Sequence, residues 1–238
     1  MRSAPVLELC GVAKAYGAQR VVEDLSLTVR QGEVVALLGP SGCGKTTILH
    51  LAAGVVAPDR GTVVTHAARI GYVFQEPRLI PWRTALDNVL FVAGAGRRER
   101  EAHRPRAVEL LATLGLEEAM DAYPGALSGG MRQRVSIARM LVRAPHLLLL
   151  DEPLSALDGA RKDELLDLLA DLLDSGRAGA LYVTHDSREA ARLADRLVLL
   201  DGPGPGERRF ASIETPRAQR ARAHHDHPRI GEPTDVPA

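Results

Sequence analysis

Residues 39–46 read Gly-Pro-Ser-Gly-Cys-Gly-Lys-Thr and match the pattern G-x-x-x-x-G-K-[ST]. An almost wholly apolar run at residues 33–38 predicts a buried parallel strand before the motif, and residues 46–53 predict a helix after it. Glycines let backbone N–H groups turn inward around phosphate oxygens, and a helix start adds further donors and a positive dipole end. The motif therefore predicts a phosphate-binding loop, although a glycine-rich turn that only connects strand to helix has a similar composition.

Each part of this loop has a predicted task in holding ATP and Mg²⁺. Lys45 supplies a point charge at the β and γ phosphates, and the Thr46 hydroxyl is a suitable Mg²⁺ ligand. Cys43 lies inside the loop, where a small filler residue is the simplest interpretation. The predicted ATP-binding residues of the loop are Gly39, Pro40, Ser41, Gly42, Cys43, Gly44, Lys45, Thr46 and Thr47.

Polar side chains also follow two other predicted strands. Asp151 and Glu152 come directly after the four leucines at residues 147–150, and His185 follows residues 181–184. The carboxyl ends of parallel strands meet at the edge of the sheet where ligands bind. Asp151 is therefore a predicted Mg²⁺ ligand, Glu152 the group that polarises the attacking water, and His185 a γ-phosphate contact. The alternative is that the acids only cap a strand in solvent and that the histidine is structural.

The rest of the chain predicts an α/β fold of the P-loop NTPase class with a mainly parallel sheet. Residues 6–12 and 21–29 alternate apolar and polar side chains, which predicts an N-terminal antiparallel β subdomain. From residue 84 to about 144, alanine, leucine, arginine and glutamate dominate at helical spacing, which predicts an inserted α-helical subdomain. Further strands are predicted at residues 70–74, 147–150, 181–184, 197–200 and 210–213, and a further helix at 157–173.

The composition and length of the chain limit the classes of protein to which it can belong. One ATPase domain is predicted for residues 1–205, and residues 206–238, rich in Arg, His and Pro, are predicted to form a partly disordered C-terminal extension. The chain of 238 residues has 30 basic and 30 acidic residues, a balance that gives no sign of a nucleic-acid partner. Its 2 cysteines favour a reducing compartment. No run of about 18 apolar residues occurs, so any membrane role must come from a partner.

Residues 127–131, Leu127-Ser128-Gly129-Gly130-Met131, resemble the LSGGQ signature of the ATP-binding-cassette (ABC) ATPase family. The resemblance covers residues 6 to about 200, and Met131 departs from the usual glutamine. It implies that the signature contacts ATP held by an opposite subunit, and serine at an N-cap followed by two glycines suits an anion. One chain cannot bring this second anion site onto its own phosphate loop. The resemblance therefore implies a head-to-tail dimer, most simply of two identical subunits.

Other positions match the same family in order. Tyr16 resembles the aromatic residue that stacks on adenine, and Asp158, in residues 155–158, belongs to a segment that resembles the loop communicating across the dimer. Gln75 resembles the glutamine that touches Mg²⁺ and the attacking water. The catalytic residues implied by the resemblance are Glu152, His185 and Gln75. The implied Mg²⁺ ligands are Thr46, Gln75 and Asp151.

Residues 74–84 are similar to a stretch in importers of nitrate, sulfonates and taurine. This resemblance implies an ATPase subunit at the cytoplasmic face of the cell membrane, held by an integral membrane permease that a substrate-binding protein supplies with such anions. Four aromatic residues lie in or near this stretch, and exposed aromatics favour protein docking. They predict a groove for a coupling helix of the permease, unless they pack the joint between the two lobes instead. The four are Tyr72, Phe74, Trp82 and Phe91.

Two other classes of protein stay open. A small-molecule kinase has the same kind of phosphate loop, but it predicts an acceptor pocket and gives no reason for residues 127–131. A non-transport cassette protein uses ATP-driven closure to remodel a soluble partner. Such proteins often carry two cassettes in one chain, whereas this chain carries one.

Overall fold

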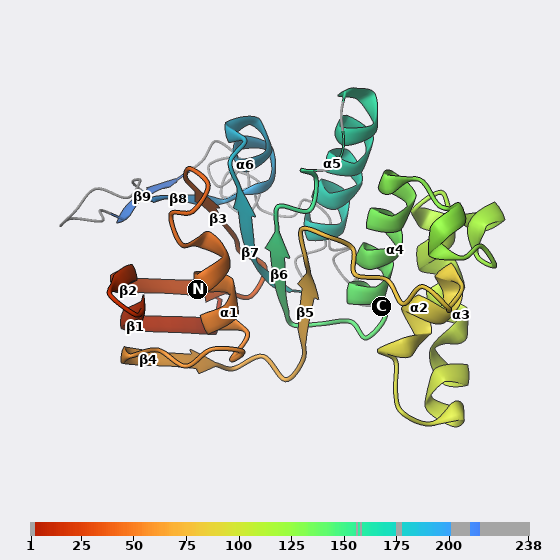
Figure 1. Ribbon diagram of the computed structural model, residues 1–238, viewed down its shortest axis with the longest axis horizontal. Helices are drawn as coiled ribbons and strands as arrows, with labels where there is room; N and C mark the ends of the chain where they lie inside the picture. Colours follow the sequence, from red (N-terminus) through yellow and green to blue (C-terminus); the bar gives the residue numbers. More distant parts are fainter. Residues whose placement is uncertain (1–2, 156, 158, 175–177, 201–209, 215–238) are drawn as a thin grey trace, which may run out of the picture.

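A six-stranded sheet forms the centre of the structure, and its strands come from both halves of the chain (Figure 1). The computed structural model describes residues 3–155, 157, 159–174, 178–200 and 210–214 of the chain. The first five strands across the sheet run parallel and the last runs antiparallel. In order across the sheet they are β5 (Ile70–Val73), β6 (Leu147–Asp151), β7 (Gly179–Thr184), β3 (Val34–Leu38), β8 (Arg196–Leu200) and β9 (Phe210–Glu214).

A second sheet of three antiparallel strands lies beside the first, at the lower left of Figure 1. Its strands are β2 (Gln19–Arg30), β1 (Pro5–Tyr16) and β4 (Arg60–Thr65), in that order. Gly61 allows β4 to approach β1: its φ is 77°, and a side chain there would collide with the backbone of Cys10 and Gly11. The predicted N-terminal antiparallel subdomain is therefore confirmed, with one more strand than predicted.

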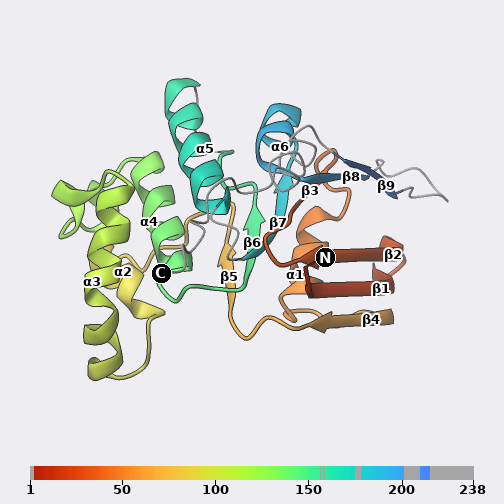
Figure 2. The same cartoon turned by 180° about the vertical axis from the view of Figure 1, so that it is seen from behind.

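Helices pack against the central sheet and form a separate lobe beside it. The helices against the sheet are α1 (Lys45–Ala52), α5 (Gly159–Asp174) and α6 (Ser187–Leu193). The helical lobe, at the right of Figure 1 and the left of Figure 2, contains α2 (Ala85–Phe91), α3 (Arg97–Thr113), η1 (Glu117–Ala119), η2 (Pro124–Ala126) and α4 (Gly129–Leu141). Within the ranges given above, none of the helices combines the length and the apolar content that crossing a membrane requires.

Alternate residues of the central strands belong to two different hydrophobic cores. In β3, Val35 and Leu37 pack with α1 and the three-stranded sheet, whereas Val34 and Ala36 pack with α5, α6 and the helical lobe. Side chains of a strand point alternately to its two faces, and both faces of this sheet are covered. This explains why the strand before the phosphate loop is apolar at nearly every position.

Most of the predicted elements are confirmed, including the inserted helical subdomain. Two elements were not predicted. β4 is exposed over most of its length, so it lacks an apolar alternation, and α6 has only 7 residues. The strand predicted at residues 210–213 corresponds to β9. The rest of the predicted extension, residues 206–209 and 215–238, lies outside the described residues, so the domain division stays a prediction.

Replacing Leu37 by alanine is expected to lower the free energy of unfolding by about 2–5 kcal/mol, because a wholly buried side chain is lost and a cavity remains. Urea unfolding followed by circular dichroism measures this change. The control is Val55→Ala, since Val55 is 69% exposed. Its expected change is within about 0.5 kcal/mol. Equal stability of the two variants would contradict the assignment of Leu37 to a core.

Candidate active site

The predicted phosphate loop connects β3 to α1 at the carboxyl edge of the central sheet. Gly42 and Gly44 have φ angles of 79° and 103°, in the left-handed region that favours glycine. Gly39 has no room for a side chain, because a Cβ atom there would lie 2.6 Å from the Leu200 carbonyl oxygen. Cys43 is buried, which agrees with its interpretation as a filler residue. The glycines are therefore required by the path of the loop.

Lys45 begins α1 and folds back into the loop. Its Nζ donates to the carbonyl oxygens of Gly39 at 2.7 Å and Pro40 at 2.9 Å. Lys45 is only 5% exposed, and its Nζ lies 3.6 Å from Glu152 Oε1. A positive charge and the N–H groups of a helix start thus share one small site. This arrangement suits a phosphate group.

Asp151 ends β6 and lies against the start of α1. The Thr46 hydroxyl donates to Asp151 Oδ1 at 3.2 Å, and the Tyr72 hydroxyl lies 3.5 Å from Oδ2. Burial raises the pKa of Asp151 above its usual value, although the Thr46 bond opposes this, and the neighbouring charge of Glu152 raises it further. A cation near Asp151 would offset both of these unfavourable effects on its ionised form.

Glu152 and His185 face each other across the ends of β6 and β7. His185 Nδ1 lies 3.0 Å from Glu152 Oε2, and the Glu152 side chain is largely buried while that of His185 is 56% exposed. Glu152 has a φ of 42°, which is unusual for a residue with a side chain, and strain of this kind is typical of functional sites. Its backbone N–H donates to the Val183 carbonyl oxygen at 3.0 Å. The carboxylate of Glu152 is therefore held between an ammonium group and an imidazole ring.

Ser128 caps the N-terminus of α4, as predicted. Its hydroxyl oxygen accepts a hydrogen bond from the Met131 N–H at 3.2 Å, and Ser128 itself is exposed. The preceding residue, Leu127, is buried, and its carbonyl oxygen accepts from Arg132 Nη1 at 2.6 Å. The signature segment is thus a fixed helix start whose cap faces solvent.

Gly129 and Gly130 form the first turn of α4 and are partly buried. Gly130 lies against Leu157, because a Cβ atom on Gly130 would be 2.9 Å from Leu157 Cδ2. In Figures 1 and 2, β5 and β6 lie between α1 and α4. The structure therefore holds two helix starts suited to anions, on opposite sides of two strands.

The comparisons with known proteins identify the family. The sequence model of the family described as "ABC transporter" matches residues 22–155. "Aliphatic sulfonates import ATP-binding protein SsuB 1" of Nocardia farcinica (strain IFM 10152) is 45% identical over 202 residues, which cover 84% of this chain and 80% of the relative. The protein of the same name from Pseudomonas aeruginosa (strain UCBPP-PA14) is 44% identical over 231 residues, or 91% of each chain. The chain belongs to the ABC transporter family.

Solved ABC structures agree with this assignment. "Dimeric Structure of MJ0796, a Bacterial ABC Transporter Cassette" matches with a TM-score of 0.73 and 32% identity, covering 82% of this chain and 94% of that chain. A post-hydrolysis state of the same cassette, bound to ADP and Pi, matches with a TM-score of 0.74 and 31% identity over 87% of this chain and 98% of that one. The predicted fold and activity are confirmed: the protein is an ATP-binding, ATP-hydrolysing subunit of an ABC transporter.

For three predicted site residues of this ABC subunit, no contact with the cluster around Glu152 is seen in the described part of the chain. Tyr16 is 50% exposed at the end of β1, with Lys14 Nζ 5.7 Å from its ring centroid. Gln75 is exposed beyond the end of β5 and makes no side-chain hydrogen bond within the described part of the chain. Asp158 lies outside the described residues. The roles of all three stay predictions.

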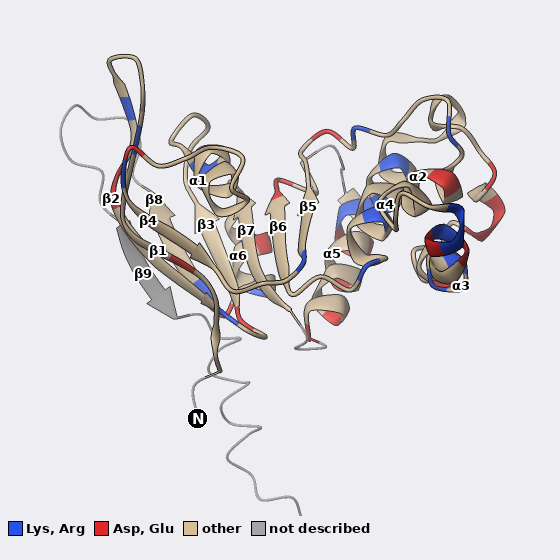
Figure 3. Ribbon diagram, turned by 90° about the horizontal axis from the view of Figure 1, so that it is seen from below, with Lys and Arg blue, Asp and Glu red and all other residues tan. Residues whose placement is uncertain are grey.

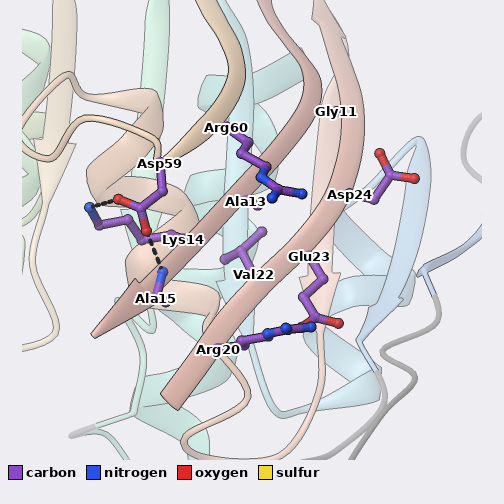
Figure 4. A pocket seen from close by; sticks show the side chains of 10 residues that line it. All are labelled: Gly11, Ala13, Lys14, Ala15, Arg20, Val22, Glu23, Asp24, Asp59 and Arg60. Atoms are coloured by element: carbon purple, nitrogen blue, oxygen red, sulfur yellow. Dashed lines mark hydrogen bonds and ion pairs between the residues drawn. The ribbon is translucent and has the colours of Figure 1, made fainter. Parts of the chain in front are cut away.

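A hollow of about 460 Å³ opens on the three-stranded sheet (Figure 4). Charged residues that line this hollow bond to one another: Lys14 Nζ donates to Asp59 Oδ1 at 2.7 Å, and Arg20 Nη1 donates to Glu23 Oε1 at 3.2 Å. The charged lining residues are Lys14, Arg20, Arg60, Glu23, Asp24 and Asp59. Because three bases face three acids, this hollow has no net attraction for a phosphate, unlike the loop around Lys45.

A larger hollow of about 580 Å³, called here the lobe groove, is lined by residues of β5 and of the helical lobe. Tyr72 and Phe74, which line the groove, stack with ring centroids 4.3 Å apart, and Phe91 of α2 also lines it while 48% exposed. Trp82 is 77% exposed but does not line the groove. Basic positions, blue in Figure 3, occur along the ribbon of α4. The arginines lining the lobe groove are Arg69, Arg78, Arg139 and Arg143.

Two contacts of the site were not predicted. The contact of Tyr72 with Asp151 joins residues 79 positions apart, and the sequence near Tyr72 carries no sign of it. Lys162 bonds Asp186, the residue after His185, at 2.7 Å. The one available signal was that Lys162 is among only three lysines in the chain.

Replacing Lys45 by alanine is expected to weaken ATP binding about 10- to 100-fold, because the charge-assisted bonds to phosphate are lost. Equilibrium titration with ATP measures the affinity. Arg98→Ala is the control, since Arg98 is exposed on α3 in the helical lobe. Unchanged ATP affinity in a folded Lys45→Ala variant would remove this lysine from the binding site.

Proposed function

We propose that this protein is the ATPase subunit of an ABC importer of aliphatic sulfonates or related anions. Two relatives are named as aliphatic sulfonates import ATP-binding proteins, and the matched region spans at least four-fifths of the length of each. In this proposal the subunit works at the cytoplasmic face of the cell membrane, bound to an integral permease that receives its substrate from a binding protein. Residues 1–205 form the ATPase domain, and residues 206–238 extend it.

The observation that carries the proposed ATPase mechanism is the separation of two helix starts that each suit a phosphate. Lys45 and α1 lie on one side of β5 and β6, and Ser128 with α4 lies on the other. Each is suited to the terminal phosphates of ATP, yet one nucleotide cannot reach both in a single chain. A head-to-tail pair solves this, because each subunit's signature then faces the phosphate loop of its partner. The similar solved structure "Dimeric Structure of MJ0796, a Bacterial ABC Transporter Cassette" is described as dimeric, which supports the pairing of two subunits.

Hydrolysis in this proposal depends on Glu152. A water oxygen forms a bond to the γ-phosphorus, the bond to the ADP oxygen breaks with its electron pair, and Glu152 accepts the proton of the water. His185 Nδ1, 3.0 Å from Glu152 Oε2, orients this carboxylate or contacts the γ-phosphate, and Lys45 neutralises charge on the phosphates. Gln75 would approach the water when the lobes close, since it is exposed just beyond β5, the strand that pairs with β6.

The residues around Thr46 fit Mg²⁺. A hydroxyl oxygen and a carboxylate oxygen, Thr46 Oγ1 and Asp151 Oδ1, lie 3.2 Å apart, and hard cations prefer such oxygen donors. Mg²⁺ is usually bound by few protein ligands together with waters and substrate phosphates, so these two residues are suitable members of such a site. When bound there, Mg²⁺ would neutralise charge on the β and γ phosphate oxygens. Gln75 is the third proposed ligand.

The lobe groove is the proposed docking site for a coupling helix of the permease. It combines exposed apolar side chains such as Phe91 with stacked rings of Tyr72 and Phe74. Exposed aromatics at a concave surface favour protein contacts. The alternative role, packing between the lobes, fits Tyr72 and Phe74 better than the exposed Phe91 and Trp82. The relatives are named as import proteins, and this favours a membrane permease over a soluble complex as the partner.

Reconstitution with the permease tests the proposed function. Liposomes carrying the complete transporter, with its binding protein outside and ATP inside, should accumulate an aliphatic sulfonate and hydrolyse ATP faster when the sulfonate is present. Transfer of phosphate to a small acceptor, or capture of a stable soluble complex without any permease, would contradict the proposal.

Glu152→Gln is expected to retain ATP binding but to lower the turnover rate by about 10²–10⁴, as for loss of a general base. Release of inorganic phosphate measures turnover, and nucleotide titration measures binding. Glu101→Gln on the exposed surface of α3 is the matched control and should keep full activity. Full turnover by the Glu152→Gln variant would refute the proposed base.

Phe91→Ala is expected to weaken assembly with the permease about tenfold, or about 1.4 kcal/mol, with little change in basal ATP hydrolysis, because only a minority of interface residues cost more than about 1 kcal/mol when truncated. Affinity for the detergent-solubilised permease measures assembly, and Trp82→Ala tests the exposed aromatic next to the groove. Val64→Ala, an exposed apolar change on β4, is the control. If both aromatic variants bound the permease as tightly as the parent, the lobe groove would not be the docking site.

A further inference from the structure

A lysine and two acids join α5 to α6 behind the turn that carries His185. Lys162 Nζ lies 2.7 Å from Asp186 Oδ2 and 2.7 Å from Glu189 Oε1. Glu189 is only 3% exposed, and Lys162, in the first turn of α5, is partly buried. One ammonium group thus bridges two carboxylates. The proposed hydrolysis uses none of these three side chains.

The second oxygen of Glu189 accepts two more hydrogen bonds from the end of β7. The Tyr182 hydroxyl donates to Oε2 at 2.6 Å, and the Thr184 hydroxyl donates to the same atom at 2.7 Å. Burial, reinforced by the Glu189 charge, raises the pKa of Tyr182 well above its usual value, so this phenol keeps the proton it donates. The Thr184 oxygen also accepts from the Asp186 N–H at 3.0 Å. Glu189 is therefore the centre of a fully bonded network.

His185 lies between two members of this network. Its neighbours Thr184 and Asp186 both bond within the network, whereas its own side chain is 56% exposed and contacts Glu152 at 3.0 Å. An exposed side chain on a short turn gains little orientation from packing. The direction in which His185 points is therefore set by the position of its turn.

Removing the ammonium group would leave Asp186 and Glu189 without their shared counter-charge. The hydrogen bond from Lys162 is the main reason that the pKa of Asp186 is below its usual value. Neighbouring carboxylates repel each other, and a buried carboxylate is costly unless it is paired. Asp186 is the less buried of the two acids, so the turn would relieve this repulsion by moving Asp186 toward solvent. His185 would move with it.

We propose that Lys162 is a positioning residue for ATP hydrolysis, which bridges Asp186 and Glu189 and so fixes the turn that aims His185 at Glu152. The proposal rests on the role proposed above for His185. It also joins the start of α5 to the active site, since Lys162 lies in the first turn of that helix.

The experiment measures steady-state ATP hydrolysis by the full-length protein assembled with its permease. Lys162→Met, which keeps the length of the side chain but not its charge, should lower kcat about 5- to 20-fold and leave the KM for ATP within about twofold. Lys162→Arg keeps the charge and should recover kcat to within about threefold of the parent. In a His185→Ala background, Lys162→Met should change kcat by less than about twofold, because residues acting as a unit are not additive.

A second ion pair between the same helices provides the control. Arg192 Nη2 of α6 lies 2.5 Å from Asp167 Oδ1 of α5, and both side chains are exposed. Arg192→Met breaks this pair without touching the turn, so kcat should stay within about twofold of the parent. Asp186→Asn keeps the cap on the Arg188 N–H but weakens the bridge, and it replaces Lys162→Met if that variant fails to fold.

The outcomes separate this inference from the proposed function. If His185→Ala retains full turnover, the role of His185 fails and the inference fails with it. If His185→Ala loses turnover while the Lys162 and Asp186 variants keep it, only the inference is overturned. Additive losses in the double variant, or an equal loss in Arg192→Met, would show that Lys162 acts through general helix packing, which also overturns it.

Discussion

The pairing of charges at the carboxyl edge of the central sheet governs the rest of the structure. One buried ammonium group, Lys45, lies among backbone carbonyl oxygens and 3.6 Å from the carboxylate of Glu152. Asp151 stands beside them, and burial raises its pKa. These groups share one small site, so a phosphate bound beside the lysine would meet a positive charge that the loop already orients. A cation bound beside Asp151 and Glu152 is favoured as well, because it would reduce the repulsion between these two neighbouring carboxylates.

The central sheet that creates this edge also divides the molecule. Its alternate side chains pack into separate cores on its two faces, with α1 in one core and α4 in the other. In Figures 1 and 2, β5 and β6 lie between these two helices. A helix start at each place suits an anion, but their separation means that one chain offers two half-sites. The proposed pairing of two subunits would answer this separation of the two helix starts.

Side chains from elsewhere in the fold orient the groups that are proposed to act on ATP. Glu189 and Lys162 hold the turn that carries His185, and the latter contacts Glu152. Tyr72 lines the lobe groove, and its hydroxyl lies 3.5 Å from Asp151 Oδ2. A single side chain therefore connects the proposed docking surface to the proposed metal ligand. Strand pairing places the ends of the strands, and these contacts set the direction of the side chains.

The sequence by itself determined the phosphate loop, the acids after β6, the histidine after β7 and the serine cap of α4. Each of these depends on neighbours within a few residues: a strand followed by glycines, a strand followed by acids, or a serine that bonds the N–H three positions later. Apolar alternation likewise predicted the long strands β1 and β2. The exposed β4 and the 7-residue α6 carry too little of this local pattern to be recognised.

Only the tertiary structure decided which distant side chains meet. The contact of Tyr72 with Asp151 spans 79 positions, and the bridge from Lys162 to Asp186 spans 24. The tertiary structure also separated the four aromatic residues, since Tyr72 and Phe74 stack while Trp82 stays exposed outside the groove. Local propensity and spacing carry no information about such pairs, because the packing of helices against the sheet, and not the chain between them, brings the atoms together.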